Sequence, residues 1–372
     1  MKRRAFLGTA AAAATTTLFT PALAGATKTV TDVLGRTVEV PINPQRVLLG
    51  FYFEDFWAIG GRQAYDRVVA ISRTAWEGWR NSQWQRYVAA EPRLNDLVDV
   101  GEVSEGTFSV ESAVAARPDV AILAAWQFNG LGEGVKKLEA AGIPVVVADY
   151  NAQTVEKHMA STHLIGAVLG GESEERGHEL AHPYGDAVAD VQARVAKAQA
   201  GGAVAPKVYV ELGNKGPDEY GNSYGKGMWA GVVETAGGNN IAKGQIGAYA
   251  PLNPEYVIAS NPDMILLAGS DWVGRPKSVV MGFGQDPAVT RDRMRAYTKR
   301  PGWSGLNAVK NGEVHAVYHG GTRTLYDFTY LQYIAKQLYF DAFADVDPLA
   351  NLREYYRTWL PIKAEGTFML KL

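Results

Sequence analysis

Two segments of this chain carry nearly the same pattern, and this internal repeat constrains the fold more than any other feature. In residues 110–123 and again in residues 254–267, a glutamate near a helix start is followed seven positions later by a Pro-Asp pair and then by an uncharged apolar run. Proline ends each short helix because it disfavours the α conformation of the residue before it. The apolar run suits a strand that is covered on both faces of a parallel sheet. The repeat therefore predicts two similar α/β halves.

The glutamates of the repeat are Glu111 and Glu255. Each lies two residues after a good helix N-cap, Ser109 in the first copy and Asn253 in the second. A carboxylate at this position interacts favourably with the positive end of the helix, which is one explanation for both residues. Their duplication at matching places in the two halves favours a second explanation, namely a shared contact with an outside partner.

Strand and helix patterns alternate on both sides of a long helical stretch. Residues 46–149 and 207–318 show the alternation that is typical of parallel sheets, whereas residues 154–200 read as helix almost throughout. We therefore expect an α/β fold of two lobes, residues 27–172 and 203–372, each a sheet with flanking helices. A linker helix is expected at residues 173–202, and a helical tail from residue 325 is expected to cover the second lobe.

The N-terminus has the pattern of an export signal. Lys2, Arg3 and Arg4 precede a weakly apolar stretch with small residues around Ala24. The paired arginines are typical of the twin-arginine type, and we expect residues 1–24 to be removed. Without these three cations the 37 basic residues fall to 34 against 39 acidic ones, a formal net charge of −5. This charge gives no reason to expect a nucleic-acid partner.

The mature chain is expected to be a freely diffusing periplasmic protein. After the signal, no apolar run approaches the length of a membrane span, so we expect no membrane insertion. The chain has no cysteine, so its stability must come from its core rather than from disulfides. Without a cysteine near the signal site there is also no attachment point for the lipid of a thioether-linked lipoprotein.

Aromatic and arginine side chains follow the predicted strands of both halves. Open α/β sheets bind ligands beyond the carboxyl ends of their strands, so two such edges facing one another would form a cleft. Aromatic and guanidinium walls suit a large, partly apolar, anionic ligand. The alternative for any one ring is that it packs against the core. The candidate ligand-binding residues are Tyr52, Arg73, Trp76, Trp79, Arg80, Trp126 and Tyr150 in the first half and Tyr224, Trp229, Trp272, Arg275, His319 and Arg323 in the second.

One motif favours an enzyme instead. His178-Glu179-Leu180-Ala181-His182 matches H-E-x-x-H, which on a helix presents two imidazoles to zinc and a glutamate to the metal-bound water. Against this, Val188 stands where a metzincin has its third histidine, and Pro183 is expected to interrupt the helix. A chance match on a solvent-facing linker explains the motif more simply. We therefore expect no metal site and no catalytic residues, and keep a zinc-dependent hydrolase as the alternative.

Several segments together resemble a known family. They are the exported N-terminus, the hairpin pattern of residues 30–41 leading to Pro44-Gln45-Arg46-Val47, both copies of the repeat, and Ala236-Gly237-Gly238-Asn239-Asn240 within residues 229–241. In combination they resemble the periplasmic substrate-binding proteins of the ferric-siderophore, haem and vitamin B12 class of ABC importers. The resemblance spans essentially the whole mature chain. It implies a class III periplasmic binding protein fold, in which a single long helix joins two lobes and the ligand lies in the cleft.

The resemblance also sets the expected function. It implies a periplasmic solute-binding protein that captures an iron chelate, above all a ferric siderophore, and delivers it to an ABC permease dimer. Glu111 and Glu255 match the positions that dock onto permease arginines in that family. An outer-membrane receptor system would act upstream, and neither a cofactor nor enzymatic activity is expected.

Other ligands stay open within the same fold. The second half is also similar to molybdate or tungstate binders, and its glycine-rich loop at residues 221–227 could cradle a small oxyanion with backbone amides. Glycine also marks plain loops, so the loop has a second explanation. Molybdate, tungstate, haem and cobalamin therefore remain alternatives to the siderophore.

Overall fold

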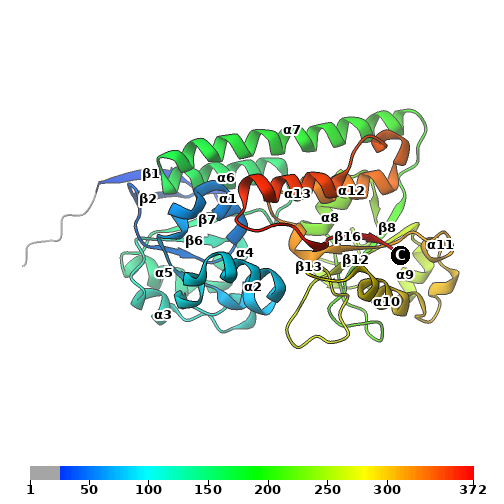
Figure 1. Ribbon diagram of the computed structural model, residues 1–372, viewed down its shortest axis with the longest axis horizontal. Helices are drawn as coiled ribbons and strands as arrows, with labels where there is room; N and C mark the ends of the chain where they lie inside the picture. The colour runs from blue at the N-terminus through cyan, green and yellow to red at the C-terminus, as the bar shows by residue number, and fades with distance from the viewer. Residues whose placement is uncertain (1–25) are drawn as a thin grey trace, which may run out of the picture.

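The computed structural model describes residues 26–372, and the predicted signal peptide at residues 1–24 lies outside the described residues. Two five-stranded sheets, one in each lobe, stand side by side, and long helices run along the top of both (Figure 1). The longest helix, α7 (Glu172–Ala200), separates the residues of the first sheet from those of the second along the chain. This is the two-lobed α/β fold with one long connecting helix that the sequence predicts.

The first lobe contains an all-parallel sheet in the order β5-β4-β3-β6-β7, preceded by an antiparallel hairpin of β1 and β2. Strands β3, β6 and β7 are uncharged and buried throughout, as the apolar runs predict. The strands are β1 (Thr27–Thr31), β2 (Thr37–Pro41), β3 (Val47–Leu49), β4 (Val68–Ile71), β5 (Val98–Asp99), β6 (Val120–Ala124) and β7 (Val145–Ala148). The helices are α1 (Phe53–Tyr65), α2 (Asn81–Ala90), α3 (Val110–Ala115), α4 (Ala125–Leu131), α5 (Glu133–Ala140) and α6 (Val155–Leu169).

The second lobe contains a sheet in the order β10-β8-β12-β14-β16, in which only the last strand is antiparallel to its neighbour. Small two-stranded sheets, β11-β9 and β13-β15, flank it. The strands are β8 (Lys207–Leu212), β9 (Asn222–Tyr224), β10 (Asn239–Asn240), β11 (Tyr249–Pro251), β12 (Met264–Gly269), β13 (Gly282–Phe283), β14 (Val314–Tyr318), β15 (Gly366–Thr367) and β16 (Met369–Lys371). The helices are α8 (Met228–Thr235), α9 (Pro254–Ser260), α10 (Pro287–Thr298), α11 (Asn307–Lys310), α12 (Phe328–Leu338) and α13 (Pro348–Trp359).

The internal repeat has the structure that its sequence predicts. In each lobe it forms a short helix, α3 or α9, followed by an interior strand, β6 or β12, all of whose residues are buried. The N-caps are formed as expected. Ser109 Oγ accepts a hydrogen bond from the Ser112 amide at 3.0 Å, and Asn253 Oδ1 accepts one from the Glu255 amide at 2.8 Å.

The expectation that Pro183 interrupts the linker helix is wrong. Helix α7 runs unbroken from Glu172 to Ala200 with this proline inside it. Proline lacks the amide that would bond to the carbonyl of Glu179, but Glu179 is exposed, so water can take that place. None of the helices in residues 26–372 combines the length and the apolar character that a bilayer crossing requires.

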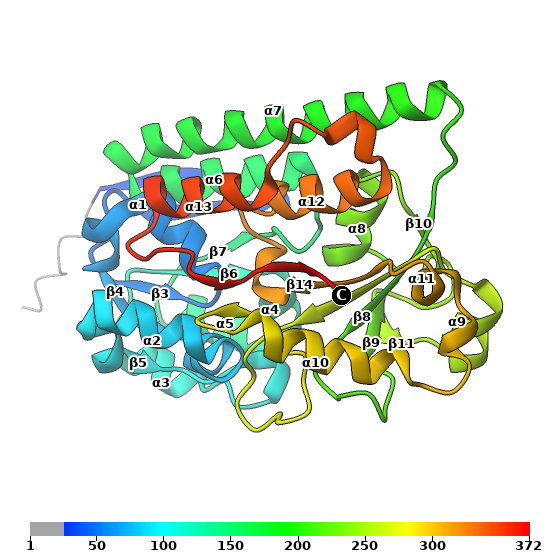
Figure 2. The ribbon, with the colours of Figure 1, turned by 45° about the vertical axis from the view of Figure 1, so that its right-hand side comes forward.

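The sequence predicts a helical tail over the second lobe alone. In the structure this tail covers both lobes. Helix α12 packs on α7, whereas α13 extends back over α1 of the first lobe (Figure 2). Tyr356 Oη on α13 donates a hydrogen bond to Glu54 on α1 at 2.8 Å, and Arg176 of α7 lies 5.3 Å from the ring centre of Trp359. Amphipathic spacing shows that a helix must pack on something, but not on which lobe.

Candidate ligand-binding cleft

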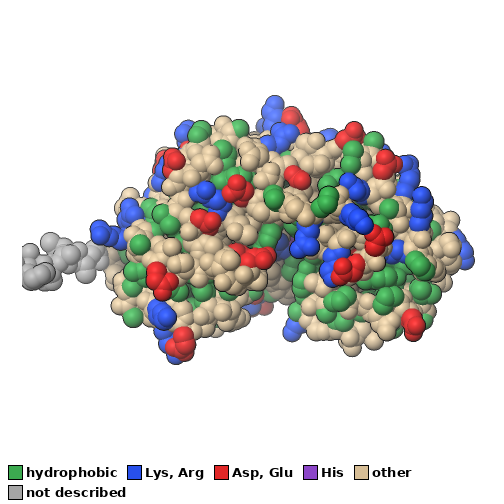
Figure 3. Space-filling view, turned by 90° about the horizontal axis from the view of Figure 1, so that it is seen from below, with side chains coloured by type: hydrophobic (Ala, Val, Ile, Leu, Met, Phe, Trp, Pro, Cys, Tyr) green, Lys and Arg blue, Asp and Glu red, His purple; other side chains and the backbone are tan. Residues whose placement is uncertain are grey.

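A cleft of about 720 Å³ lies between the two lobes. Its walls come from the segments that follow strands β3 to β7 in the first lobe and β8, β12 and β14 in the second. The surface is indented between the lobes when the molecule is seen from below (Figure 3). The cleft therefore lies at the carboxyl ends of both sheets, where the rule for open α/β sheets places ligands.

Seven of the thirteen candidate ligand-binding residues line this cleft. Three of them are tryptophans that are only half-buried and so can present their faces to a ligand. Arg275 is exposed at the mouth. The seven are Trp79, Arg80 and Trp126 from the first lobe and Trp272, Arg275, His319 and Arg323 from the second. Their contact with a ligand stays a prediction.

Three other candidates do not line the cleft: Arg73 is half-buried in the first lobe, and the other two lie in its core. Arg73 donates from Nη2 to the backbone oxygens of Asn95 and Leu97, both at 2.8 Å. Trp76 is fully buried and stacks on the Phe53 ring at 4.5 Å. Tyr150 is fully buried too, and its hydroxyl lies 3.0 Å from that of Thr162. For these residues the packing explanation describes the structure better than the ligand explanation.

The remaining three candidates support cleft residues from behind. The Tyr52 hydroxyl donates to Oδ1 of Asn151, a lining residue, at 2.8 Å. Trp229 donates from Nε1 to Nδ1 of His319 at 3.1 Å. Tyr224 is buried with its ring centre 6.3 Å from that of His319. These residues orient the cleft wall without forming it.

The central feature of the cleft is a pair of buried arginines, one from each lobe. The guanidinium groups of Arg80 and Arg323 lie 5.3 and 5.2 Å from the ring centre of Phe51, and each arginine is only 5% exposed. Within residues 26–372 neither forms an ion pair with a carboxylate. Nη2 of Arg80 and Nε of Arg323 are buried without a hydrogen-bond partner. Because an unpaired buried cation is unfavourable, this pair is suited to an anion from outside.

The charge of the cleft is positive at neutral pH. Burial and the neighbouring Arg80 lower the pKa of Arg323 to about 10, so its guanidinium remains protonated. Burial, followed by the two guanidinium groups, lowers the pKa of His319 well below the usual imidazole value, so this ring is neutral. Among the lining residues in the described part of the chain, Glu105 at the exposed rim is the one acidic residue.

One side of the cleft mouth is bridged by hydrogen bonds between the lobes. The Val273 amide donates to the Gly78 carbonyl oxygen at 3.0 Å, and the Ser270 hydroxyl donates to the Trp79 carbonyl oxygen at 2.8 Å. The Ser82 amide donates to Asp271 Oδ2 at 3.2 Å. These bonds hold the segments that carry Trp79 and Trp272 in a fixed relation across the cleft.

Some lining residues were not among the sequence candidates. Phe51, Asn151 and Asn214 follow strands β3, β7 and β8, so the strand-end rule applied to every strand would have found them. Asn214 has a buried Oδ1 without a hydrogen-bond partner. Tyr249 comes from β11, a short strand of a small side sheet, and no signal in the sequence indicates its place in the cleft.

In the glycine-rich loop at residues 221–227, which the sequence offers as an oxyanion cradle, two glycine amides already have partners inside the protein. The Gly221 amide donates to Glu211 Oε1 at 2.8 Å, and the Gly225 amide donates to the Ala248 carbonyl oxygen at 3.1 Å. The Met228 amide, at the start of α8, donates to the Asn151 carbonyl oxygen at 3.0 Å. Amides that already have internal partners are not free for an anion.

The H-E-x-x-H histidines lie on the helical layer, outside the cleft. His178 and His182 are exposed on α7, with ring centres 6.3 Å apart, and His163 of α6 lies 4.4 Å from the ring of His178. Within residues 26–372 no group of three or more His, Cys, Asp or Glu side chains is placed to hold a metal ion. Both histidines of the motif are solvent-exposed, as the sequence indicates, and they lie outside the cleft.

Glu111 and Glu255 are both exposed, on α3 and α9 in opposite lobes (Figure 1). This placement leaves both carboxylates accessible to a partner. The proposed docking onto a permease stays a prediction.

The sequence and the structure of this chain are similar to those of known proteins. The periplasmic binding protein family matches residues 51–317. The solved TroA-like periplasmic binding protein FepB of Veillonella parvula is 33% identical, with a TM-score of 0.83, over 92% of this chain and 99% of that one. The molybdate-binding protein MolA of Haemophilus influenzae is 23% identical over 367 residues, 89% of this chain and 90% of MolA.

A further relative is an uncharacterized ABC transporter substrate-binding lipoprotein, YvrC of Bacillus subtilis, which is 23% identical over 297 residues, 78% of this chain and 77% of YvrC. The family match spans both lobes and the helix between them. This chain therefore belongs to the periplasmic binding protein family, the substrate-binding proteins of ABC importers.

Proposed function

We propose that this protein captures an anionic metal chelate, in particular a ferric siderophore, and delivers it to the permease of an ABC importer. The observation that carries the proposal is the buried pair Arg80 and Arg323, which has no carboxylate partner within residues 26–372. Two desolvated guanidinium groups beside one phenyl ring favour a ligand that carries delocalised negative charge on planar groups. Ferric catecholate complexes have this chemistry.

The size and lining of the cleft support a bulky ligand. Trp79, Trp126 and Trp272 contribute apolar faces around a volume of about 720 Å³, which exceeds the needs of a five-atom oxyanion. Aromatic faces stack on planar rings, and catecholate rings fit this description. The protein is proposed to bind and release its ligand without chemical change.

Molybdate is the second candidate. The relative named molybdate-binding protein MolA matches 89% of this chain, and an arginine pair also suits a tetrahedral oxyanion. The cleft is larger than molybdate requires, whereas the similarity to MolA favours molybdate. Haem and cobalamin remain outcomes of the same experiment.

Tryptophan fluorescence tests the ligand directly, because three tryptophans line the cleft. The purified mature protein is titrated with a ferric tris-catecholate complex, a ferric hydroxamate complex, haem, cobalamin and molybdate. We expect the ferric tris-catecholate complex to bind most tightly and the iron-free catechol to bind weakly. Saturable quenching by molybdate alone would remove the chelate from the proposal.

Export and docking complete the proposed role. A twin-arginine signal at residues 1–24 would deliver the protein to the periplasm, with an outer-membrane receptor system upstream. Glu111 and Glu255 would then contact permease arginines on the two lobes. Metal analysis is the check on the enzyme alternative: stoichiometric zinc that disappears in His178→Ala would contradict a purely binding role.

A further inference from the structure

The loop between β14 and α12 carries His319 and Arg323 into the cleft, and its backbone is strained. Arg323 has a φ of 58°, in the left-handed region that residues other than glycine rarely adopt. Such a conformation persists only where the surrounding structure holds it. Something outside the loop must therefore stabilise it.

The support comes from the opposite lobe. Gln153, which follows β7, accepts hydrogen bonds at Oε1 from the Thr322 hydroxyl at 3.0 Å and from the Arg323 backbone amide at 3.3 Å. Asp55 on α1, only 1% exposed, accepts one at Oδ1 from the Leu325 amide at 2.7 Å. The loop of the second lobe is thus tied to the first lobe on both sides of Thr324.

The orientation of the Gln153 amide is set by the buried carboxylate of Asp327. Gln153 donates from Nε2 to Asp327 Oδ2 at 2.6 Å. Because a carboxylate only accepts, the amide must turn its nitrogen to Asp327 and its oxygen to Arg323. The same Asp327 oxygen lies 2.9 Å from His158 Nε2, while His158 Nδ1 lies 3.0 Å from the Thr154 carbonyl oxygen.

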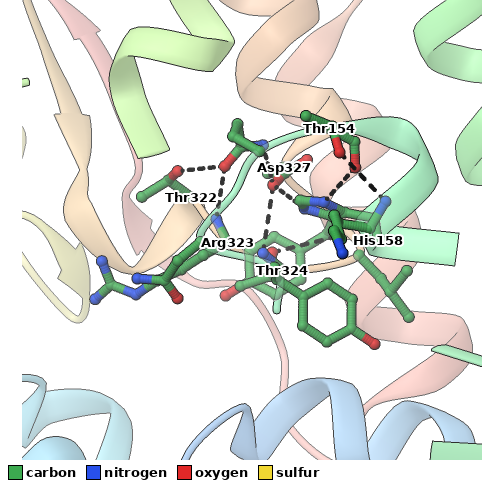
Figure 4. A network of polar contacts seen from close by, with 12 residues as sticks. Thr154, His158, Thr322, Arg323, Thr324 and Asp327 are labelled. Carbon is green, nitrogen blue, oxygen red and sulfur yellow. Dashed lines mark hydrogen bonds and ion pairs between the residues drawn. The ribbon is translucent and has the colours of Figure 1, made fainter. Parts of the chain in front are cut away.

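Both ring nitrogens of His158 lie against acceptor oxygens, Nε2 against Asp327 and Nδ1 against the Thr154 carbonyl. The two side chains are 0% and 2% exposed. Figure 4 shows Asp327 facing His158, with the Arg323 side chain extending away from this network. Imidazole, carboxylate, amide and backbone therefore form one chain of polar contacts.

We propose that Gln153 is a positioning residue for Arg323, and that Asp327, which lies against His158, sets the orientation of its amide. The inference rests on the proposed function, in which Arg323 binds an anion. Arg80 belongs to the first lobe and Arg323 to the second, so Gln153 fixes the spacing of the two guanidinium groups across the cleft. The anion site is thereby preformed before the ligand arrives.

A double-mutant cycle separates positioning from general destabilisation. Gln153→Leu keeps the bulk of the side chain and removes its hydrogen bonds. We expect it to lower the affinity for the ferric tris-catecholate probe about 10-fold in the wild-type background and less than 2-fold in the Arg323→Ala background, because its effect passes through Arg323. Equal losses in both backgrounds would overturn the proposal.

Gln199→Leu is the matched control for this cycle. It removes the hydrogen bond from Gln199 on α7 to the Tyr339 hydroxyl, 2.9 Å long and away from the lining residues of the cleft. We expect it to leave the probe affinity within 2-fold. A loss as large as that of Gln153→Leu would mean that broken polar contacts act through stability alone, and the positioning role would be wrong.

Amide hydrogen exchange of Arg323 in the ligand-free protein distinguishes failure of this inference from failure of the proposed function. We expect exchange to be at least 10-fold faster in Gln153→Leu and unchanged in Gln199→Leu. Unchanged exchange in Gln153→Leu overturns the positioning role even if the probe binds. Faster exchange in a protein that binds none of the probes supports the positioning role and overturns the proposed function.

A single change of functional group at Gln153 provides a second test. Gln153→Glu brings two carboxylates together where an amide nitrogen and an oxygen are now 2.6 Å apart, so exchange should accelerate and affinity should fall. Slow exchange and wild-type affinity in a folded Gln153→Glu variant would refute the hydrogen-bond chain.

Discussion

Arg300 and Arg323 are equally buried, at 5% exposure each, but their surroundings differ. Arg300 donates from Nη1 and Nη2 to the two carboxylate oxygens of Glu211 at 2.6 and 2.9 Å, and its other donors bond to backbone carbonyl oxygens. Arg323 lies near Arg80 and His319 instead, and its Nε has no hydrogen-bond partner within residues 26–372. A buried arginine with its carboxylate completes a core, whereas one without it offers a site to an external anion.

Aromatic neighbours do not distinguish the two arginines. Arg300 lies 4.4 Å from the ring centre of Tyr220 and 4.8 Å from that of Trp303, and Arg323 lies 5.2 Å from that of Phe51. Cation–π contact therefore occurs in both the structural and the proposed binding environment. The presence or absence of a carboxylate is what separates them, and the predictions below test this difference.

The largest effect is expected for Arg300→Ala. It leaves Glu211, which is fully buried, without its cation, and breaking such a pair costs about 3–5 kcal/mol of unfolding free energy. Urea unfolding measures this loss, and the protein that remains folded should keep its ligand affinity. Replacing both Arg300 and Glu211 by methionine should recover only part of the stability, because the Gly221 amide and the backbone carbonyl oxygens that Arg300 reaches lose their partners. A loss below about 1 kcal/mol for Arg300→Ala would break the comparison, because Arg300 would then not be structural.

Arg323→Ala and Arg80→Ala should have the opposite effect, lowering ligand affinity without lowering stability. Each removes a cation that faces the proposed anion, so affinity for the ferric tris-catecholate complex should fall about 100-fold, or roughly 2.8 kcal/mol. Thermal stability should be unchanged or higher, because an unpaired buried charge is removed. Arg275→Ala at the exposed mouth is the control, with a small effect that decreases at high salt. Affinities within 3-fold of wild type for both buried variants would contradict the anion site.

Glu102 is a buried carboxylate that forms no ion pair within residues 26–372, so it extends the comparison of paired and unpaired buried charges to an acidic side chain. Burial raises its pKa from 4.5 to about 7. A raised carboxyl pKa contributes stability that is fully present below pH 4.5 and is lost as pH rises through 7. Glu102→Gln removes this loss, so the variant should be more stable than wild type by roughly 2–3 kcal/mol at pH 8 and equal to it at pH 4. If Glu102→Gln and wild type have equal unfolding free energies at both pH values, Glu102 is not the titrating group.

The smallest effects on the isolated protein are expected for Glu111→Ala and Glu255→Ala. Both carboxylates are exposed, so stability should change by no more than about 0.5–1 kcal/mol and ligand affinity should stay within 2-fold. Uptake of the iron chelate by intact cells should fall. Glu133→Ala is a matched control, since Glu133 is also an exposed glutamate in the first turn of a helix. If Glu133→Ala impairs uptake equally, or if either test variant weakens ligand binding, the docking role is wrong.

Much of the fold could be predicted because its signals are local. The repeat at Glu111 and Glu255 indicated two sheets, the uncharged runs became the buried strands β6 and β12, and the long helical stretch became α7. The two corrected expectations concern packing. Helix α7 continues through Pro183 at a point where Glu179, one turn earlier, is exposed, and α13 extends over the first lobe, where Tyr356 bonds to Glu54.

The candidate site was predicted in part for the same reason. Strand direction places side chains at a common edge, so Trp79, Trp126 and Trp272 could be assigned to the cleft from the chain alone. Trp76 and Tyr150 have the same residue types and follow strands too, but they point into the core. Helical and loop geometry after a strand decides which ring faces outward, and residue type does not encode it.

The sequence by itself determined the two-lobed α/β architecture, the connecting helix and the edge at which the cleft lies, because periodicity and chain direction are local properties. Only the tertiary structure decided which buried arginines have partners. Glu211 pairs with Arg300 across 89 positions of sequence, and Gln153 of one lobe holds Arg323 of the other across 170. A counter-charge is a property of neighbours in space, so the distinction between a structural arginine and a binding arginine appears only when the chain has folded.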